Sequence, residues 1–271
     1  MKTGITKITL KGYKSINKEQ SIEIKPLTIL AGANSSGKSS FLQPLLLMKQ
    51  TLEASFDPGP LLINVPIINF TSTEQFLSKT KSKQAKEFSI SIKDEQIEIG
   101  LVFRRNNGSI IIEDMSYENS SSENSITSKF NLNCKLTHEK LTKIVNLQNF
   151  NGTTFFNEFG KPKFKLVVIR NRCFLAVAFS IGENKGNLRP NIDFSETHQR
   201  YITELIHLPG IRGNPERTYQ VTSLGYSPPG KFEYYIASII NYWQMKKNFK
   251  KLNSLNEDLK TLGITKNVTA Y

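Results

Sequence analysis

The segment that most constrains the fold covers residues 27–40 and reads Leu-Thr-Ile-Leu-Ala-Gly-Ala-Asn-Ser-Ser-Gly-Lys-Ser-Ser. Gly32 and Gly37 are five residues apart, and Lys38 and Ser39 follow the second glycine directly. This arrangement fits the G-x-x-x-x-G-K-[ST] pattern of a phosphate-binding loop. A coincidental turn rich in Gly and Ser is the alternative, so the flanking residues have to be considered as well.

Both flanks fit such a loop. The apolar run of residues 27–31 predicts a buried strand that leads into the loop. A helix is predicted after the loop, as far as about Glu53, and Pro44 predicts a kink inside it. A strand, the loop and a helix in this order are the context that the pattern requires. The apolar face of the predicted helix comprises Phe41, Leu42, Leu45 and Leu46.

The residue types suit a triphosphate. The two glycines let the backbone approach phosphate oxygens without a Cβ in the way. The backbone amides then form an anion-binding nest at the positive end of the following helix. We predict that Lys38 reaches the β- and γ-phosphates, that Ser39 ligates Mg²⁺, and that Ser40 binds the α-phosphate. The predicted nucleotide-binding residues are Gly32, Ala33, Asn34, Ser35, Ser36, Gly37, Lys38, Ser39 and Ser40.

The charge balance favours anionic partners. The 271-residue chain has 36 Lys and Arg against 23 Asp and Glu, a formal net charge of +13 with a pI near 9.6. Nucleic acid is the first candidate partner, although a basic surface also serves solubility. Cys134 and Cys173 give neither a disulfide framework nor a metal-binding spacing. No apolar run is long enough to span a bilayer and the N-terminus has no signal-peptide pattern, so we expect a cytoplasmic protein.

Alternating apolar and polar residues predict an antiparallel part of the fold. Short strands are expected within residues 4–13 and 21–24, and a meander begins at Glu87 with a hairpin turn at residues 104–108. The segment 110–114 has two interpretations, because an apolar run before a glutamate is also typical of the strand that carries the catalytic carboxylate of a nucleotide hydrolase. Since the segment lies inside an alternating pattern, we favour an ordinary hairpin strand.

The opening of the chain resembles the ABC-type ATPases of the SMC, RecF and OLD group. The resemblance rests on residues 11–15, which read Lys-Gly-Tyr-Lys-Ser, on Asn34, and on the double serine after Lys38. It implies an α/β fold, a P-loop NTPase lobe of the ABC-ATPase type with an antiparallel β meander and a helical C-terminal part. It also implies that Lys14 approaches a phosphate and that a Gln after the first helix ligates Mg²⁺, for which Gln75 is the best-placed candidate. The alternatives are a solvated hairpin lysine and a solvent-facing glutamine.

The same resemblance implies a division of the chain and a need for a partner. We expect a P-loop ATPase core with a β-rich insertion over residues 1–190 and an incomplete helical segment over residues 191–271. The signature segment, the strand with the catalytic acid and the switch histidine of the family are not recognisable before Tyr271. ATP with Mg²⁺ is therefore expected to bind, with hydrolysis only after completion by a partner subunit, a second copy in a homodimer or a further C-terminal part.

DNA repair or phage defence is the context that the resemblance implies, with DNA as a candidate partner and no membrane. A non-catalytic nucleic-acid or protein interaction module that keeps the P-loop fold is the alternative. A GTP-using regulator is disfavoured, because no Asn-Lys-x-Asp segment is present to bind the base.

The C-terminal part carries two further patterns. An amphipathic helix is predicted over residues 195–208, and the loop after it resembles a segment of a bacterial, AAA-21-like branch of these ATPases. Arg212 and Arg217 in this loop pair either with phosphates or partner acids, or with Glu216 in a purely structural loop. A second helix, over about residues 231–255, is expected to bury its apolar stripe in the core. A basic patch near its end, facing either solvent or nucleic acid, comprises Lys246, Lys247, Lys250 and Lys251.

Overall fold

The protein is a mixed α/β structure with antiparallel sheets, as predicted. The computed structural model describes residues 4–34, 36–65, 67–80, 83–120, 128–147, 164–181, 188–208 and 232–270. The chain forms two compact units, Met1–Thr203 and Glu204–Tyr271. None of the described helices is long and apolar enough to cross a membrane. They are α1 (Lys38–Leu52), α2 (His138–Leu147) and α4 (Glu196–Thr203) in the first unit, and α5 (Ile236–Met245) and α6 (Phe249–Thr261) in the second.

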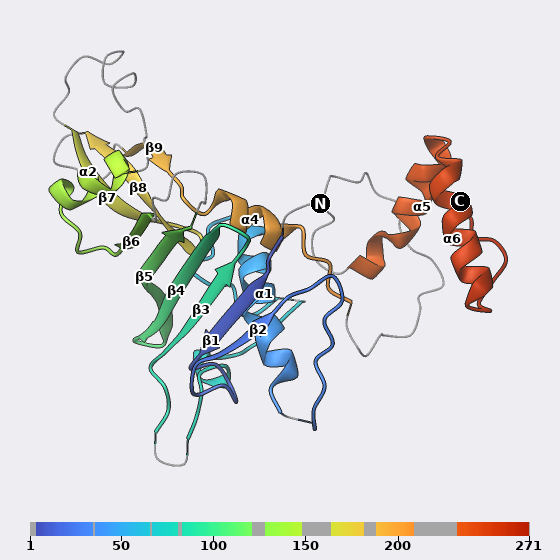
Figure 1. The fold of residues 1–271 in the computed structure, drawn as a ribbon, viewed down its shortest axis with the longest axis horizontal. Coiled ribbons are helices and arrows are strands. Elements are labelled where there is room, and N and C mark those ends of the chain that lie inside the picture. Colours follow the sequence, from blue (N-terminus) through green and yellow to red (C-terminus); the bar gives the residue numbers. More distant parts are fainter. Residues whose placement is uncertain are drawn as a thin grey trace. The chain divides into compact units, whose positions relative to one another are not determined.

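A six-stranded antiparallel sheet dominates the first unit (Figure 1). Its order is β2-β1-β3-β4-β5-β6, so β1 lies between β2 and β3 and the later strands follow in chain order. The predicted meander is therefore confirmed, and the two N-terminal strands belong to the same sheet. The strands are β1 (Lys7–Lys11), β2 (Gln20–Glu23), β3 (Glu87–Lys93), β4 (Ile97–Asn106), β5 (Ser109–Asn119) and β6 (Ser128–Leu132).

The sheet has one buried and one open face, because its strands alternate apolar and polar residues. On the buried face, Ile8 of β1 pairs with Ile92 of β3 and Leu10 pairs with Ile90. None of these four side chains is more than 2% exposed. The period of two in the sequence thus places the core on one side of the sheet. In β4 the same face continues through Ile99, Leu101 and Phe103.

The β4–β5 hairpin turns at Asn107 and Gly108, which have φ angles of 47° and 86°. An Asn-Gly pair adopts this left-handed turn readily, because glycine has no Cβ and asparagine tolerates positive φ. Beyond the turn, Glu113 of β5 forms an ion pair with Arg104 of β4, with 2.6 Å between Arg104 Nε and Glu113 Oε2. The segment 110–114 is an ordinary hairpin strand, as predicted.

Helix α1 begins at the phosphate-binding pattern and continues through Pro44 to Leu52. Its buried polar residue Lys49 has two partners. Lys49 Nζ lies 2.6 Å from Glu53 Oε1 and donates a hydrogen bond to the Thr203 carbonyl oxygen at 2.5 Å. A buried charge is tolerated only with such partners. Here the lysine connects α1 to the C-terminal end of α4.

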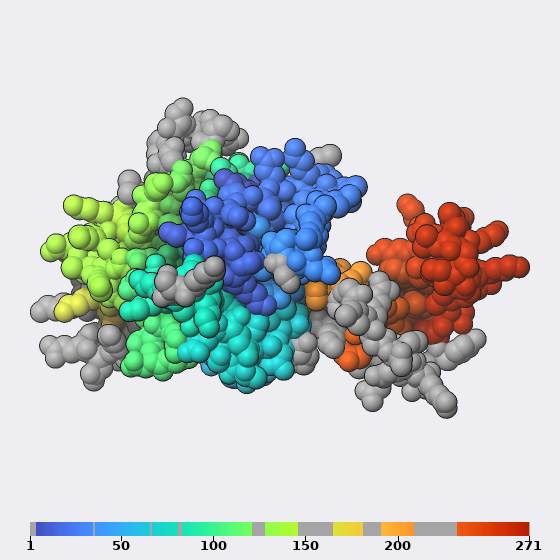
Figure 2. All heavy atoms as spheres, turned by 90° about the horizontal axis from the view of Figure 1, so that it is seen from below, coloured from blue at the N-terminus to red at the C-terminus, as the bar shows by residue number. Residues whose placement is uncertain are grey.

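Aromatic side chains fill the core between the first strands and the segment after α1. Tyr13, in the turn between β1 and β2, stacks on Phe76 with 5.9 Å between ring centroids. Both rings meet Phe88 of β3 edge-on, at 5.3 and 5.8 Å, and Phe88 stacks on Phe103 at 5.0 Å. In Figure 2 the surfaces of the N-terminal strands (dark blue) and of the segment after α1 (cyan) lie side by side. The cluster therefore fixes the β1–β2 turn against the rest of the unit.

A second antiparallel sheet has three strands in the order β7-β8-β9. Residues 174–179 of β8 are all buried. The Leu175 amide donates a hydrogen bond to Met115 Sδ of β5 at 3.3 Å, so the two sheets are in contact within the first unit. The strands are β7 (Phe164–Asn171), β8 (Phe174–Ile181) and β9 (Leu188–Ile192).

The predicted buried strand over residues 27–31 is wrong. These residues pair with no strand among those described, and Leu27 and Ile29 are 79% and 78% exposed. A continuous apolar run becomes a buried strand only where other elements cover both of its faces. In the described sheet β1 pairs with β2 and β3, which leaves the run outside.

The two C-terminal helix predictions are wrong in extent. Helix α4 is shorter than the predicted 195–208, and the helix expected over 231–255 is interrupted between α5 and α6. Lys247 in the interruption has a φ of 50°, which a continuous helix does not allow. Asn248 then caps α6, because its Oδ1 accepts a hydrogen bond from the Lys251 amide at 3.4 Å.

The second unit contains α5, α6 and a short 3₁₀ helix, η2 (Phe232–Tyr235). Of the predicted apolar stripe, Ile240 is buried whereas Ile236 is 45% exposed, so the expectation that the whole stripe is core is wrong. The segment after α6 folds back. The Ala270 amide donates to Gln244 Oε1 of α5 at 2.9 Å and the Val268 amide to Asn256 Oδ1 of α6 at 3.1 Å.

Candidate phosphate-binding site

Two glycines shape the loop between residue 31 and α1. Gly37 caps α1 with a φ of 98°, and Gly32 has a φ of 152°. A Cβ on Gly37 would lie 2.7 Å from Ser15 Oγ, and one on Gly32 would lie 2.9 Å from Ser36 Oγ. Both positions therefore favour glycine, for backbone conformation and for space.

Lys38, the first residue of α1, folds back over the loop. Its Nζ donates hydrogen bonds to the carbonyl oxygens of Gly32 and Ala33, both at 2.7 Å. A phosphate above the loop would offer this ammonium group a charged acceptor, which forms a stronger hydrogen bond than a carbonyl. The lysine is thus held where its charge can meet an anion.

Backbone hydrogen bonds fix the loop itself. The Ser36 amide donates to the Ala33 carbonyl oxygen at 3.3 Å, and the Ser40 amide donates to that of Gly37 at 2.9 Å. The amides of the first turn of a helix have no acceptor within the helix. Ser39 is exposed on that turn whereas Ser40 is buried, so the Ser39 hydroxyl faces the open side.

The turn between β1 and β2 brings two more residues to the loop. The Lys14 amide donates to the Phe76 carbonyl oxygen at 2.8 Å, and Lys14 Nζ lies 4.8 Å from the centre of the Phe70 ring. Burial lowers the pKa of Lys14. Ser15 follows directly, and its Oγ is the atom that faces Gly37. The packed turn therefore holds a lysine and a hydroxyl beside the loop.

A pocket of about 420 Å³ opens where the loop, the first turns of α1 and the β1–β2 turn meet. None of its described lining residues is acidic, and two of them are lysines. Two positive charges, several hydroxyls and a helix N-terminus make the pocket suitable for an anion. The lining comprises Lys14, Ser15, Asn34, Ser36, Gly37, Lys38, Ser39, Ser40 and Gln43.

The same residues fit Mg²⁺ only together with a nucleotide. Mg²⁺ takes oxygen ligands, chiefly carboxylates, waters and phosphates. The described lining offers hydroxyl and amide oxygens without a carboxylate. Across the described residues, no group of three or more His, Cys, Asp and Glu could hold a metal ion. Mg²⁺ in this pocket would therefore be held jointly by Ser39 and by phosphate oxygens.

Gln75, the other predicted Mg²⁺ ligand, is not among the described residues that line this pocket. It ends a short 3₁₀ helix, η1 (Thr73–Gln75), after α1. Its Oε1 accepts a hydrogen bond from the Thr71 amide at 3.0 Å, and its Nε2 donates to the Thr71 hydroxyl at 2.8 Å. Gln75 precedes Phe76, whose carbonyl binds Lys14, so its backbone is near the site while its side chain contacts Thr71.

The sequence predictions missed Gln43. It lies on α1 and lines the pocket, and its Oε1 is buried without a hydrogen-bond partner among the described residues. The spacing of four residues from Ser39 could have identified it, because residues four apart share one face of a helix.

Other residues that the sequence suggested lie elsewhere. The Glu113 carboxylate binds Arg104 on the meander and is not among the described lining residues of the pocket. Ser35 of the loop, and Arg212 and Arg217, lie outside the described residues. The structure thus brings together the described residues of the loop and Lys14, and leaves Gln75 and Glu113 apart from them.

Comparison with known protein families agrees with this geometry. The model of a family described as an AAA ATPase domain matches residues 1–171. The matched part contains the loop, α1, the six-stranded sheet and β7. No curated protein matches the chain.

Proposed function

The chain belongs to the AAA ATPase domain family, and on this premise we propose that it binds Mg-ATP at the loop of residues 32–40. The family implies nucleotide binding and ATPase-type function. Beyond what the family implies, we propose which residues hold the nucleotide and under which conditions it is hydrolysed.

The observation that carries the proposal is the position of Lys38. Its ammonium group is held 2.7 Å from two loop carbonyls, in a pocket whose described lining has no acid. An ammonium group with neutral acceptors in a site without a counter-ion favours an incoming anion. Gly37 lines the pocket at the N-terminus of α1, where the helix dipole favours an anion.

Each side chain has its own task in this proposal. Lys38 exchanges its two carbonyl acceptors for oxygens of the β- and γ-phosphates, and Lys14 adds a second positive charge. The Ser39 hydroxyl ligates Mg²⁺, and Ser40 binds the α-phosphate. Bound Mg²⁺ neutralises phosphate charge and assists transfer of the terminal phosphoryl group. Gln75 joins the metal site only by leaving Thr71, so its part in the proposal requires a side-chain movement.

Hydrolysis, in this proposal, requires a partner subunit, a second copy or a further C-terminal part. The attacking water has to be positioned by a carboxylate or a glutamine. The described lining of the pocket has no carboxylate, and Glu113 is paired with Arg104. In the ABC-type group that the N-terminal segment resembles, each nucleotide is held between two subunits. We assign the chain to that SMC, RecF and OLD-like group, with a core over residues 1–190 and a helical segment over residues 191–271.

The proposed context is DNA repair or phage defence in the cytoplasm, with DNA as a candidate partner. The net charge of +13 supports an anionic partner. A non-catalytic interaction module with the same loop is the second candidate, because it too needs no carboxylate in the pocket. The two candidates differ in whether phosphate is released once the partner is present.

Calorimetric titration of Mg-ATP into wild type, Lys38→Ala and Lys140→Ala tests the binding site. We expect Lys38→Ala to weaken binding by about tenfold or more, or about 1.4 kcal/mol and upward. Lys140 is exposed on α2, so its substitution is a matched control that should leave the affinity unchanged. Ser39→Ala should weaken binding of Mg-ATP but not of ATP in the presence of EDTA.

A phosphate-release assay on the same samples tests the need for a partner. We expect no release by the isolated wild type. Release that Lys38→Ala abolishes would overturn the partner requirement, and Glu113→Gln would then be the next variant. Failure of a folded wild type to bind any nucleoside triphosphate would overturn the proposed site.

A further inference from the structure

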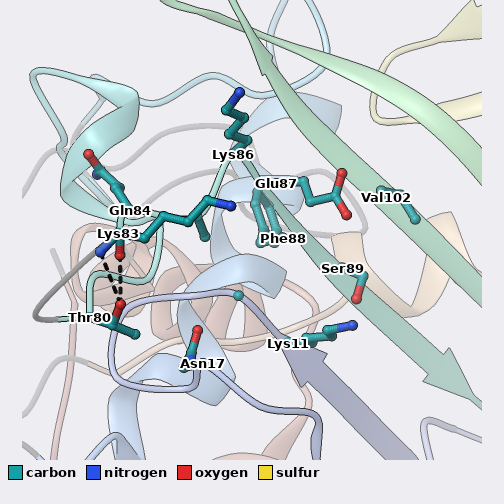
Figure 3. Close-up of a pocket in the computed structure, with 12 residues that line it drawn as sticks. Lys11, Asn17, Thr80, Lys83, Gln84, Lys86, Glu87, Phe88, Ser89 and Val102 are labelled. Carbon is teal, nitrogen blue, oxygen red and sulfur yellow. Dashed lines mark hydrogen bonds between the residues drawn. The ribbon is translucent and has the colours of Figure 1, made fainter.

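A second, larger pocket of about 700 Å³ adjoins the same β1–β2 turn (Figure 3). The middle of that turn, Lys14 and Ser15, lines the phosphate-binding pocket, whereas its ends, Lys11 and Asn17, line the second pocket. None of the described residues that are predicted to bind nucleotide lines the second pocket. It is therefore a separate site that the nucleotide proposal leaves without a role.

The open face of the six-stranded sheet forms one wall of this pocket. Lys11 of β1 pairs with Ser89 of β3, and Ser89 pairs with Val102 of β4. Cross-strand partners lie on the same face of a sheet, so these three side chains form a row on the face away from the core. The wall is rigid, because the same strands carry the buried aromatic cluster on their other face.

The opposite wall is the segment that leads into β3. Thr80 and Lys83 are joined by hydrogen bonds between the Thr80 hydroxyl and the Lys83 backbone, at 2.9 and 3.2 Å (Figure 3). The Ala85 amide donates to the Ser78 carbonyl oxygen at 2.8 Å. The Arg105 amide donates to the carbonyl oxygen of Lys86, also at 2.8 Å. The backbone of Lys86 is thus bonded to β4 of the sheet, whereas that of Lys83 is bonded to Thr80 of its own segment.

The charge of the pocket is positive. Lys11, Lys83 and Lys86 line it and have no ion-pair partner among the described residues. The one acid among its described lining residues, Glu87, pairs with Arg104, with 2.7 Å between Arg104 Nη2 and Glu87 Oε2, and Arg104 also pairs with Glu113. The three lysines outnumber the one carboxylate of the described lining, so the surface in and beside the pocket attracts an anion.

The directions of these lysines distinguish a compact anion from an extended one. In Figure 3, Lys83 reaches across the pocket, Lys86 points away from it, and Lys11 points along the sheet. A compact phosphate needs converging donors, whereas donors that diverge along a surface suit a chain of phosphates. Exposed Lys18 and Lys79 extend the positive surface beyond the pocket at either wall.

Among the described lining residues of the pocket, no exposed ring is available to an unstacked base. Phe88 is their one aromatic residue and is 1% exposed, so it cannot serve as a stacking platform. Contacts would therefore be made to the backbone of the ligand and not to its bases. A concave opening admits a flexible single strand, whereas a rigid duplex reaches only its rim.

We propose that this pocket, with Lys11, Lys83 and Lys86, is an interaction surface for the phosphodiester backbone of single-stranded nucleic acid. The choice of nucleic acid as the ligand rests on the proposed function, in which DNA is a partner. The inference adds the surface that binds the nucleic acid and its single-stranded form. Because backbone contacts carry no sequence information, binding is independent of sequence and strongly dependent on salt.

Fluorescence anisotropy with a labelled oligothymidylate of about 20 nucleotides tests the proposal, over salt concentrations from about 50 to 200 mM. Wild type is compared with the double variant Lys83→Gln/Lys86→Gln and with the matched control Lys140→Gln/Lys143→Gln on α2, which removes the same charge. The logarithm of the binding constant falls linearly with the logarithm of the salt concentration. For single strands, each lost phosphate contact makes this slope shallower by about 0.7. For the pocket variant alone, we expect the slope to become shallower by about 1.4 and the affinity to be about tenfold weaker.

Three outcomes would overturn the proposal. The first is no binding by wild type at the lowest salt concentration, and the second is an equal loss in the control variant. The third is displacement of the oligonucleotide by tripolyphosphate at equal phosphate concentration, which would make the pocket a site for a small anion. Unchanged thermal midpoints of both variants show that they are folded.

Lys38→Ala separates this proposal from the nucleotide site. The variant should bind the oligonucleotide as wild type does, because Lys38 is not among the described residues that line the second pocket. Loss of oligonucleotide binding in Lys38→Ala would place the strand on the loop and overturn the assignment to the second pocket. If Lys38→Ala loses ATP binding but keeps oligonucleotide binding, the result supports the second pocket as a binding site independent of the nucleotide site.

Discussion

Two apolar stretches of the N-terminal unit differ in burial. In β3, Phe88, Ile90 and Ile92 alternate with polar residues, and none is more than 1% exposed. The run of residues 27–31 is more continuously apolar, yet Leu27 and Ile29 are about four-fifths exposed, at 79% and 78%. An alternating strand needs cover on one face, whereas a continuous apolar strand needs cover on both.

Apolar content alone therefore does not decide whether a stretch is buried. In the sheet β3 lies between β1 and β4, and the rings of Tyr13 and Phe76 cover its apolar face, so its alternating residues are buried. The described residues supply no such neighbours to residues 27–31. The free energy of unfolding of the first unit should therefore depend strongly on β3 and hardly at all on the run before the loop.

The largest effect is expected from Phe88→Ala. Phe88 contacts Tyr13, Phe76 and Phe103, so truncation leaves a cavity at the centre of the aromatic cluster. We expect a loss of about 3–5 kcal/mol in the free energy of unfolding, measured by urea denaturation. Phe56→Ala is the matched control, because Phe56 is 61% exposed, and it should cost less than about 1 kcal/mol.

An equal loss in Phe56→Ala and Phe88→Ala would contradict this interpretation of the sheet. It would mean that the aromatic cluster adds no more to the free energy of unfolding than a surface ring does. The difference in burial between β3 and residues 27–31 would then have no effect on stability.

A smaller effect is expected from Gly12→Ala, which tests how tightly the β1–β2 turn fits the sheet. Gly12 has a φ of 76°, and a Cβ there would lie 2.5 Å from the Glu87 carbonyl oxygen. Strain and displacement of the turn should cost about 1–3 kcal/mol in thermal or urea unfolding. The turn carries Lys14 and Ser15, so affinity for Mg-ATP should fall as well.

Gly59→Ala is the control for this variant. Gly59 also has a positive φ, of 90°, but a Cβ there would meet nothing within 4 Å among the described atoms. If Gly59→Ala destabilises the protein as much as Gly12→Ala, the cost comes from backbone conformation alone. The close fit of the turn against β3 would then contribute nothing.

How much of the fold the sequence could predict follows from the range of each interaction. Strands β1 to β5 were predictable, because alternation and an Asn-Gly turn are local signals that agree with short-range pairing. The break between α5 and α6 was not, since Lys247 at positive φ follows helix-forming residues and has no sequence signature. The run 27–31 was mispredicted because its burial depends on neighbours that its own residues do not specify.

The candidate site shows the same division. Lys38, Gly32 and Gly37 are identified by a fixed spacing, because the loop is a local structure. Lys14 came from resemblance, since the contact between the turn and the loop depends on tertiary packing. The second pocket was not foreseen at all, because Lys11 and Lys83 are far apart in the chain and meet through the pairing of β1 with β3.

A still smaller effect, dependent on pH, is expected from His198 of α4. Its side chain is 1% exposed, so the charged form of the ring would be costly to bury. Burial lowers its pKa below the usual 6.5, and the charge of Asp94 opposes this shift. The unfolded chain therefore takes up the proton first. The stabilising contribution is complete above about pH 6.5 and is lost as the pH falls below it.

Urea unfolding between pH 7.5 and pH 5.5 measures this contribution. One proton changes the free energy of unfolding by at most about 1.4 kcal/mol per pH unit. His198→Leu should reduce the slope. Burial also lowers the pKa of His207, so a slope of the same sign from that residue should remain in the variant. An unchanged slope in His198→Leu would show that His198 does not titrate in this range.

The smallest effect is expected from Ile29→Ala, which tests directly whether residues 27–31 are exposed in solution. With a side chain that is 78% exposed, truncation removes little buried surface and should change the free energy of unfolding by less than about 0.5 kcal/mol. A loss of about 2 kcal/mol would mean that the run is covered in solution, since only burial makes a truncated Ile that costly. Repeating the unfolding at several protein concentrations would then separate cover by a second copy, which weakens on dilution, from cover within one chain, which does not. In either case residues 27–31 would be part of a core. The difference in burial from β3 would then hold only among the described residues.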